Sequence, residues 1–145
     1  MKKAINDFRI NMPSKSVNEG FLRTVCAAFS GLCDPTVEEL SDIKTAVSEA
    51  VTNAIVHGYK EKTGRIYIDA VLFSDSTVRI RIRDKGCGIS DVKKAMEPLY
   101  TTAGDDRSGL GFTVMESFTD KLSVRSAVGK GTVVTLTKKI AGKCE

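Results

Sequence analysis

Two polar residues, Glu49 and Asn53, stand four positions apart in a stretch with helical spacing. Side chains at positions i and i+4 of a helix project side by side, so a carboxylate and an amide oxygen would point to one place. Such a pair can hold a general base beside a metal ligand, although taken alone it is more often an ordinary polar helix surface. Glu49 is the only formal charge between residues 45 and 59, which indicates that something other than bulk water covers this helix face.

A second group, Asp84 with Gly86 and Gly88, follows a β-branched run and predicts a tight loop at the end of a strand. Glycines allow the backbone to approach a flat ligand closely. An ionised Asp only accepts hydrogen bonds, so Asp84 would suit the exocyclic amine of adenine and repel the carbonyl that guanine carries there. The alternative is a plain turn at the end of a strand.

A third run, residues 107–111, places Arg107 and two glycines before an apolar helical pattern. Backbone N–H groups at a helix N-terminus bind phosphate, and the Arg107 guanidinium would add a positive charge and two parallel N–H donors. Ordinary helix capping beneath a lid is the alternative. The chain has no complete dinucleotide fingerprint, no G-x-x-x-x-G-K-[ST] loop and no D-F-G run, so any use of ATP requires a different scheme.

Alternating apolar residues predict the strands that would position these groups. The expected strands are 8–12, 66–72, 78–82, 122–124 and 134–136. Strands and helices come in runs, which favours an α+β fold with helices on one face of a largely antiparallel sheet. Arg79, Arg81 and Arg83 alternate outward, and we interpret them as a solvated sheet face rather than a nucleic-acid platform, since few aromatic residues lie nearby.

Apolar spacing of three and four residues predicts the helices. The first would follow a capping box of Ser16 and Glu19. The buried stripe expected for it is Phe21, Val25, Ala28, Phe29 and Leu32. A long helix would begin at a second capping box, Thr36 and Glu39, and end near Gly58. A short helix capped by Ser90 and another over 109–118 complete the pattern.

The composition is typical of one globular domain over residues 1–145. The chain has 22 Lys and Arg, 18 Asp and Glu, and 41% hydrophobic residues. No apolar run approaches the ~18 residues of a membrane span, and the basic start is followed at once by polar residues, so we expect a soluble, unexported, cytoplasmic domain. The four cysteines form no C-x-x-C pair and His57 is the only histidine, which argues against a zinc site.

Taken in order, the runs 49–53, 84–88, 109–111 and 131–132 resemble the N, G1, G2 and G3 boxes of the GHKL ATPase/kinase superfamily. The runs 48–59, 98–102 and 107–116 are similar to the anti-sigma serine-kinase branch of that superfamily from spore-forming bacteria. The resemblance covers nearly the whole chain. It implies a Bergerat-type two-layer α/β sandwich, with a mixed, mostly antiparallel sheet, helices on one face, and ATP between the long helix and a lid.

The resemblance also implies roles for individual residues. Glu49 would be the general base, Asn53 the Mg²⁺ ligand and Asp84 the partner of the adenine amine. The other expected nucleotide contacts are Gly86, Gly88, Thr101, Thr102, Arg107, Ser108, Gly109, Leu110, Gly111 and Thr132.

The activity implied by the resemblance is that of an anti-sigma factor and ATP-dependent protein serine kinase. It would bind and inhibit a sporulation sigma factor and phosphorylate a serine of the corresponding anti-anti-sigma factor, with ATP and Mg²⁺ as cofactors. A homodimer is expected, with the first strand and first helix, including Arg23, docking the partners; neither membrane nor direct nucleic-acid binding is expected.

Three other functions are open at this point. They are a non-catalytic ATP-dependent module that binds a sigma factor, a general-stress anti-sigma kinase, and the catalytic domain of a sensor histidine kinase. The last is disfavoured because 145 residues leave no room for a phosphoacceptor helix pair.

Overall fold

The computed structural model of the protein describes residues 2–60, 62–96 and 111–142. Its five strands form one sheet in the order β1-β2-β3-β5-β4. They are β1 (Ala4–Pro13), β2 (Arg65–Phe73), β3 (Thr77–Asp84), β4 (Lys121–Ala127) and β5 (Gly131–Lys139). We expected a mixed, mostly antiparallel sheet, but every pairing between neighbouring strands is antiparallel. The α+β sandwich is confirmed.

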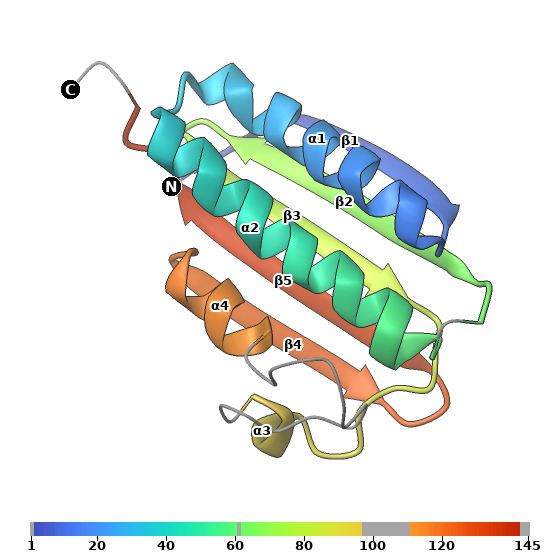
Figure 1. Cartoon of the computed structure of the whole chain (residues 1–145). Helices are drawn as coiled ribbons and strands as arrows, with labels where there is room; N and C mark the ends of the chain where they lie inside the picture. The colour runs from blue at the N-terminus through green and yellow to red at the C-terminus, as the bar shows by residue number, and fades with distance from the viewer. Residues whose placement is uncertain (1, 61, 97–110, 143–145) are drawn as a thin grey trace.

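The helices cover one face of this sheet. The long helix α2 (Val37–Asn53) lies between α1 (Glu19–Ser30) and α4 (Gly111–Ser117), and the short α3 (Val92–Ala95) lies near β4 (Figure 1). Three short helical turns complete the described part: η1 (Ser16–Asn18), η2 (Gly31–Cys33) and η3 (Ala54–Gly58). The opposite face of the sheet carries none of these helices (Figure 1).

The core lies between the helices and the sheet. Alternate residues of the central strands point inward, and Ile66 and Ile68 of β2 are almost fully buried. Val47 and Val51 of α2 and Met115 of α4 meet them from the helical layer. Burial of a large aliphatic side chain contributes about 1.5–3 kcal/mol, so this layer contact fixes where α2 and α4 lie on the sheet.

The second predicted capping box is confirmed at the start of α2. The Thr36 hydroxyl accepts a hydrogen bond from the Glu39 N–H at 3.1 Å, and the Glu39 carboxylate accepts one from the Thr36 N–H at 2.9 Å. The helical run ends at Gly58, as expected, but its last turn is a π-helix in which the Tyr59 N–H reaches the carbonyl oxygen of Ala54 at 2.9 Å. A π turn widens the helix, and such turns are frequent at functional sites.

The other two capping predictions are wrong. Ser16 begins the 3₁₀ turn η1, and α1 starts only after Asn18, whose side chain makes no capping hydrogen bond. At α3 the cap is Asp91, whose carboxylate accepts a hydrogen bond from Lys94 N–H at 3.0 Å, and not Ser90. Neighbouring polar residues can compete for the same role, and the backbone dihedrals at the helix start decide between them.

The stripe predicted for α1 is wrong in part: Phe29 packs against the core, whereas Phe21 and Leu32 do not. The residues that this helix buries are Leu22, Cys26, Ala27 and Ser30. Phe21 is 51% exposed and Leu32 is 64% exposed. The two stripes differ by about one position, and small side chains such as Cys26 and Ser30 allow the helix to approach α2 and the sheet closely, which hydrophobicity alone does not reveal.

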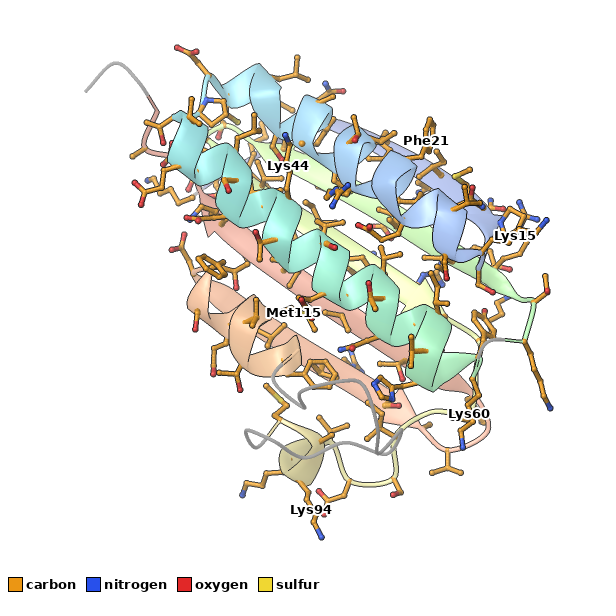
Figure 2. All side chains as sticks on the ribbon, viewed as in Figure 1. Lys15, Phe21, Lys44, Lys60, Lys94 and Met115 are labelled. Atoms are coloured by element: carbon orange, nitrogen blue, oxygen red, sulfur yellow. The ribbon has the colours of Figure 1, made fainter. Side chains whose placement is uncertain are left out.

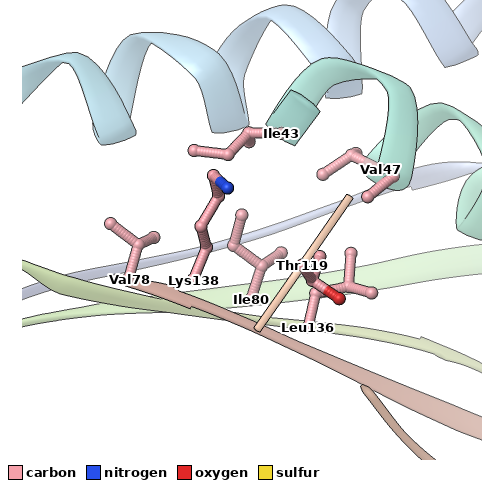
Figure 3. Close-up of a pocket in the computed structure, with 8 residues that line it drawn as sticks. Ile43, Val47, Val78, Ile80, Thr119, Leu136 and Lys138 are labelled. Atoms are coloured by element: carbon pink, nitrogen blue, oxygen red, sulfur yellow. The ribbon is translucent and has the colours of Figure 1, made fainter. Parts of the chain in front are cut away.

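A small cavity lies in the core beneath α2. Its volume is about 10 Å³, and its lining includes Ile43, Val47, Leu136 and the stem of Lys138 (Figure 3). This is about the minimum that holds one water molecule, so the cavity is no ligand site. Each helix of the described ranges is too short or too polar to cross a bilayer.

Candidate active site

The end of the long helix and the loop after β3 are packed backbone against backbone. The carbonyl oxygen of Gly58 accepts a hydrogen bond from the Cys87 N–H at 2.8 Å. A Cβ atom at Gly86 would lie 2.1 Å from that same oxygen, and one at Gly58 would lie 2.9 Å from the Asp84 carboxylate. Glycine is therefore required at position 86, where a side chain would push the helix end away from the loop, and a side chain at position 58 would displace the Asp84 carboxylate.

Asp84 ends β3 and is paired with Thr132 of β5 across the sheet. Its side chain is buried, with 8% of the residue exposed, and its Oδ1 accepts a hydrogen bond from the Gly86 N–H at 2.9 Å. Burial raises the pKa of Asp84, while the backbone N–H groups of Gly86 and Thr132 oppose that rise. A buried carboxylate of this kind destabilises the fold unless it binds something, which is typical of a functional position.

Tyr59 stabilises this loop from the side of the helix, a role the sequence did not reveal. Its hydroxyl accepts a hydrogen bond from the Lys85 N–H at 2.8 Å and donates one to the carbonyl oxygen of Arg65 at 2.5 Å. One side chain thus joins the π turn to the start of β2 and to the residue after Asp84. Only the strand register brings these backbone groups together, so no local sequence signal could have identified Tyr59.

Ser126 is a second residue that the sequence analysis missed. Its hydroxyl accepts a hydrogen bond from the Ile89 N–H at 2.7 Å and lies 2.8 Å from the Thr132 hydroxyl. Ser126 and Thr132 are paired across β4 and β5, so the hairpin register sets this contact. The Thr132 hydroxyl is thereby held by a hydrogen bond next to the Asp84 position.

Glu49 and Asn53 lie together against the start of α4. A Cβ atom at Gly111 would lie 3.1 Å and 3.2 Å from the two terminal atoms of the Asn53 amide, and 3.4 Å from Glu49 Oε1. A carboxylate and an amide from adjacent turns of α2 therefore converge on one glycine, which is the arrangement that their spacing predicts. Because Gly111 has no side chain, both polar groups keep space beside them.

A polar groove of about 340 Å³ runs between α1 and α2 and reaches Glu49 at one end. Its lining includes Arg23 of α1 and Lys44 and Ser48 of α2, and Figure 2 shows Lys44 between the two helices. Arg23 also forms an ion pair with Glu19 at 3.7 Å. Glu49 thus both lines this groove and lies close to Gly111 at the start of α4.

The remaining predicted site residues divide into two groups. Gly88 has a positive φ of 78° and lies so close to the β4–β5 hairpin that a Cβ would stand 2.1 Å from the Ala127 carbonyl oxygen. The others lie outside the described residues: Thr101, Thr102, Arg107, Ser108, Gly109 and Leu110.

Few side chains that could bind a metal ion lie close together in the described part of the chain. Across residues 2–60, 62–96 and 111–142, no group of three or more His, Cys, Asp or Glu side chains could hold a metal ion. The amide of Asn53, with Glu49 close by, is the donor set at the start of α4. Such a set fits Mg²⁺, which keeps several waters and takes few protein ligands when phosphates supply the rest.

Comparisons with known proteins identify the family of the chain. Residues 16–138 match the family model described as the histidine kinase-like ATPase domain. The chain is 54% identical over 136 residues to the anti-sigma F factor of Thermoanaerobacter sp. (strain X514), with 93% of this chain and 94% of the relative covered. It is 51% identical to the anti-sigma F factor of Clostridium acetobutylicum, over 94% of this chain and 95% of that protein.

Solved structures share the fold. The RsbU and RsbW domains of Rv1364c from Mycobacterium tuberculosis superpose with a TM-score of 0.67 at 22% identity, covering 94% of this chain and 33% of that one. The histidine kinase domain of the Erythrobacter litoralis EL346 blue-light activated kinase gives 0.57 at 19% identity, covering 86% and 60%. With its buried Asp84, its Glu49–Asn53 pair and this degree of identity, the chain belongs to the anti-sigma F factor family, within the histidine kinase-like ATPase domains.

Proposed function

We propose that this protein uses ATP to phosphorylate a serine of an anti-anti-sigma factor, and that it binds and inhibits a sporulation sigma factor. The name of its relatives, anti-sigma F factor, supports the sigma-factor partner. The observation that carries the kinase proposal is the convergence of Glu49 and Asn53 on Gly111 at the start of α4. A side chain at position 111 would crowd both polar groups, so glycine there leaves space for a ligand beside them.

Asp84 is the proposed site of adenine recognition. Its carboxylate is buried and aligned by the Gly86 N–H, and burial raises its pKa, so a hydrogen-bond donor from a ligand would relieve an unfavourable environment. The exocyclic amine of adenine is such a donor, whereas guanine presents an acceptor at the same position. Selectivity for ATP over GTP follows from this single contact, with Gly86, Gly88 and Thr132 around it.

Glu49 is the proposed general base. The groove between α1 and α2 ends at this carboxylate, so a protein segment lying there could present a serine hydroxyl to it. The hydroxyl proton would pass to Glu49 as the serine oxygen bonds to the γ-phosphorus, the bond from that phosphorus to the bridging oxygen breaks, and ADP leaves. Phosphoryl transfer depends mostly on positioning and charge neutralisation, and a positioned base adds about 10²–10⁴-fold.

Asn53 is the proposed protein ligand of Mg²⁺. Bound at the amide oxygen, this cation would neutralise charge on the phosphates of ATP. We assign the remaining phosphate contacts to the run 107–111 with Thr101 and Thr102, on the strength of the family resemblance. One domain over residues 1–145 would then carry both the nucleotide and the partner sites, in the cytoplasm, where sigma factors act.

A homodimer is part of the proposal, and the edge of the molecule formed by β1 and α1 supports it. β1 is an edge strand of the sheet, so no described strand pairs with its outer edge. Near it, Phe21 is 51% exposed and Val17 is 80% exposed, although both are large apolar side chains. An unpaired strand edge beside apolar side chains is suited to contact with a second copy.

The decisive experiment combines the protein with its anti-anti-sigma partner and [γ-³²P]ATP. We expect label on serine of the partner, dependent on Mg²⁺. Capture of the sigma factor in the presence of ATP without any labelled serine would instead establish a non-catalytic binding module. A thermal-shift comparison of ATP with GTP tests the adenine assignment separately, and an equal shift with both nucleotides would remove the proposed role of Asp84.

A further inference from the structure

The face of the sheet that carries no helix is rich in arginine. The strand register places three rows of outward-pointing residues across the five strands, with Arg83 beside Tyr67, Arg81 beside Asp69 and Arg79 beside Val71. The same rows continue into β1 on one side and into β5 and β4 on the other. In Figure 1 the described helices all lie on the opposite side of the sheet.

These rows concentrate the positive charge of the protein. They hold six cations, Arg9, Arg79, Arg81, Arg83, Lys121 and Arg125, against two carboxylates, Asp7 and Asp69. The excess is +4, which equals the formal net charge of the whole chain. We call this surface, defined by those six cations, the arginine face; Lys2 and Lys85 add further positive charge beside it, over the rings of Phe73 and Tyr67.

The central arginines are held in place by their neighbours but are only partly neutralised. Arg81 forms an ion pair with Asp69 at 3.3 Å. The guanidinium of Arg79 lies 5.2 Å from the centre of the Phe73 ring, and its shielded Nε has no hydrogen-bond partner among the described residues. Arg83 lies 5.5 Å from the centre of the Tyr67 ring. Aromatic contact of this kind orients a guanidinium and leaves its N–H donors available to an anion.

Along β3 the three guanidinium groups project at intervals of two residues, roughly 7 Å apart. A flat array of oriented arginines at this spacing is complementary to several carboxylates on another surface, and each guanidinium can bind one in a bidentate manner. We infer that the arginine face is a docking surface for an acidic protein, distinct from the nucleotide site on the helical side. Because the sheet separates the two sites, both can be occupied at once.

The details of the face favour a protein partner over nucleic acid or a lipid surface. Tyr67 and Phe73 already lie under cations of this chain, with Lys85 and Lys2 as the second cation of each, so neither ring is open for base stacking. Arginine and tyrosine beside small apolar residues such as Val71 are, in contrast, typical of protein interfaces.

The test compares two triple variants of the full chain that carry the same net charge. One is Arg79→Gln with Arg81→Gln and Arg83→Gln. The matched control is Lys15→Gln with Lys93→Gln and Lys94→Gln, which removes three exposed cations elsewhere; Figure 2 shows Lys94 on α3. The probes are fluorescent poly-L-glutamate, a single-stranded oligodeoxynucleotide of equal charge, and vesicles containing phosphatidylserine, all at one ionic strength.

We expect the arginine variant to lose about tenfold in affinity for polyglutamate, as three exposed ionic contacts allow, while the lysine control stays near wild type. Binding of Mg-ATP is expected to be unchanged in both. An equal loss in the two variants would mean that only net charge matters and would overturn the inference. Tighter binding of the oligonucleotide or the vesicles than of polyglutamate would overturn it as well, in favour of those partners.

A second variant keeps the test valid if the triple change prevents folding. Arg83→Gln with Arg125→Gln removes two exposed cations from the same row of the face without touching Arg79, which packs on Phe73. Circular dichroism and the unfolding midpoint establish that it is folded. Wild-type affinity of this folded variant for polyglutamate would contradict the docking surface.

Discussion

The carbonyl oxygen of Gly58 accepts a hydrogen bond from the backbone N–H of Cys87, at 2.8 Å. This bond joins the last turn of the long helical run to the loop that follows Asp84. The helix that carries Glu49 and Asn53 and the loop proposed to bind adenine are therefore one packed unit. A substitution on one side of the site should alter the other side only when it disturbs this backbone contact. Single side-chain substitutions can therefore separate the roles of Glu49, Asn53 and Asp84.

Replacing Glu49 by Gln removes the proposed proton acceptor and keeps the size of the side chain. We expect serine phosphorylation to fall by about 10²–10⁴-fold while ATP affinity is retained, since the base acts only in the transfer step. Labelled phosphoserine and calorimetric ATP binding measure the two effects. Glu38→Gln, an acidic residue in the first turn of α2, is the matched control. Transfer at the wild-type rate in Glu49→Gln would remove the assignment.

Replacing Asn53 by Ala is expected to weaken binding of ATP in the presence of Mg²⁺ and to have little effect in EDTA. The physical reason is that the amide oxygen is proposed to bind the cation rather than the nucleotide itself. Isothermal titration with and without Mg²⁺ measures the difference. Asn53→Asp, which keeps an oxygen at this position, should recover the dependence on the metal. A loss of the same size in EDTA would show that Asn53 acts on the nucleotide or on the fold.

Replacing Asp84 by Asn should abolish the preference for ATP over GTP and also change how stability depends on pH. Burial raises the pKa of Asp84 above its ordinary value of 3.8, so the folded state binds a proton more readily than the unfolded state. The contribution of this group is therefore most favourable below its ordinary pKa and is lost as pH rises through the raised value. Urea unfolding of the nucleotide-free protein from acidic to neutral pH should show this loss in the wild type and not in Asp84→Asn. If the free energy of unfolding changed with pH in the same way in both proteins, the proposed titration of Asp84 would be contradicted.

Replacing Gly111 by Ala should reduce transfer without reducing stability. The added Cβ would lie 3.1–3.4 Å from the polar atoms of Asn53 and Glu49, so those groups must shift by a few tenths of an ångström. Displacement of catalytic groups by up to about 1 Å can cost as much as 10²-fold in rate. Alanine also restricts the unfolded chain, which contributes about 0.4–1 kcal/mol to stability where the backbone tolerates it. A slower transfer with an unchanged or higher unfolding midpoint is expected; wild-type transfer would argue against the proximity.

Replacing Glu39 by Ala should destabilise the fold far from the active site. The carboxylate accepts hydrogen bonds from Thr36 and also from the N–H groups of Ala141 at 2.7 Å and Gly142 at 3.1 Å, so it caps α2 and attaches the chain after β5. Loss of a cap typically costs about 0.5–2 kcal/mol. Urea unfolding at neutral pH measures it, with Glu38→Ala as the control for charge in the first turn.

The same substitution has a definite pH signature. Burial raises the pKa of Glu39, but the hydrogen bonds from Thr36, Ala141 and Gly142 lower it more, and the net value lies below the ordinary 4.5. The stabilisation is thus present above pH 4.5 and is lost as pH falls through the lowered value. Wild type and Glu39→Ala should therefore converge in stability under acidic conditions. A difference in unfolding free energy between the two proteins that stays constant with pH would show that Glu39 acts through packing alone.

Local spacing alone determined several parts of this protein. The Thr36–Glu39 capping box and the convergence of Glu49 with Asn53 depend on residues three or four positions apart, and helix geometry sets such distances whatever packs around them. Strand alternation likewise identified the inner residues of β2 and β3, because one face of each strand is buried. Errors arose where two adjacent positions offered similar chemistry, as with Ser90 and Asp91.

Only the tertiary structure decided which distant residues meet. Gly111 reaches Asn53 because α4 packs on α2, Ser126 meets Thr132 because of the hairpin register, and Tyr59 reaches Lys85 because a π turn ends the helix beside the loop. The exposure of Phe21 follows in the same way from the rotation of α1 on its neighbours. Each of these contacts depends on how whole helices and strands are placed. Their placement is set by packing free energy summed over the entire core, so no short stretch of sequence can predict it.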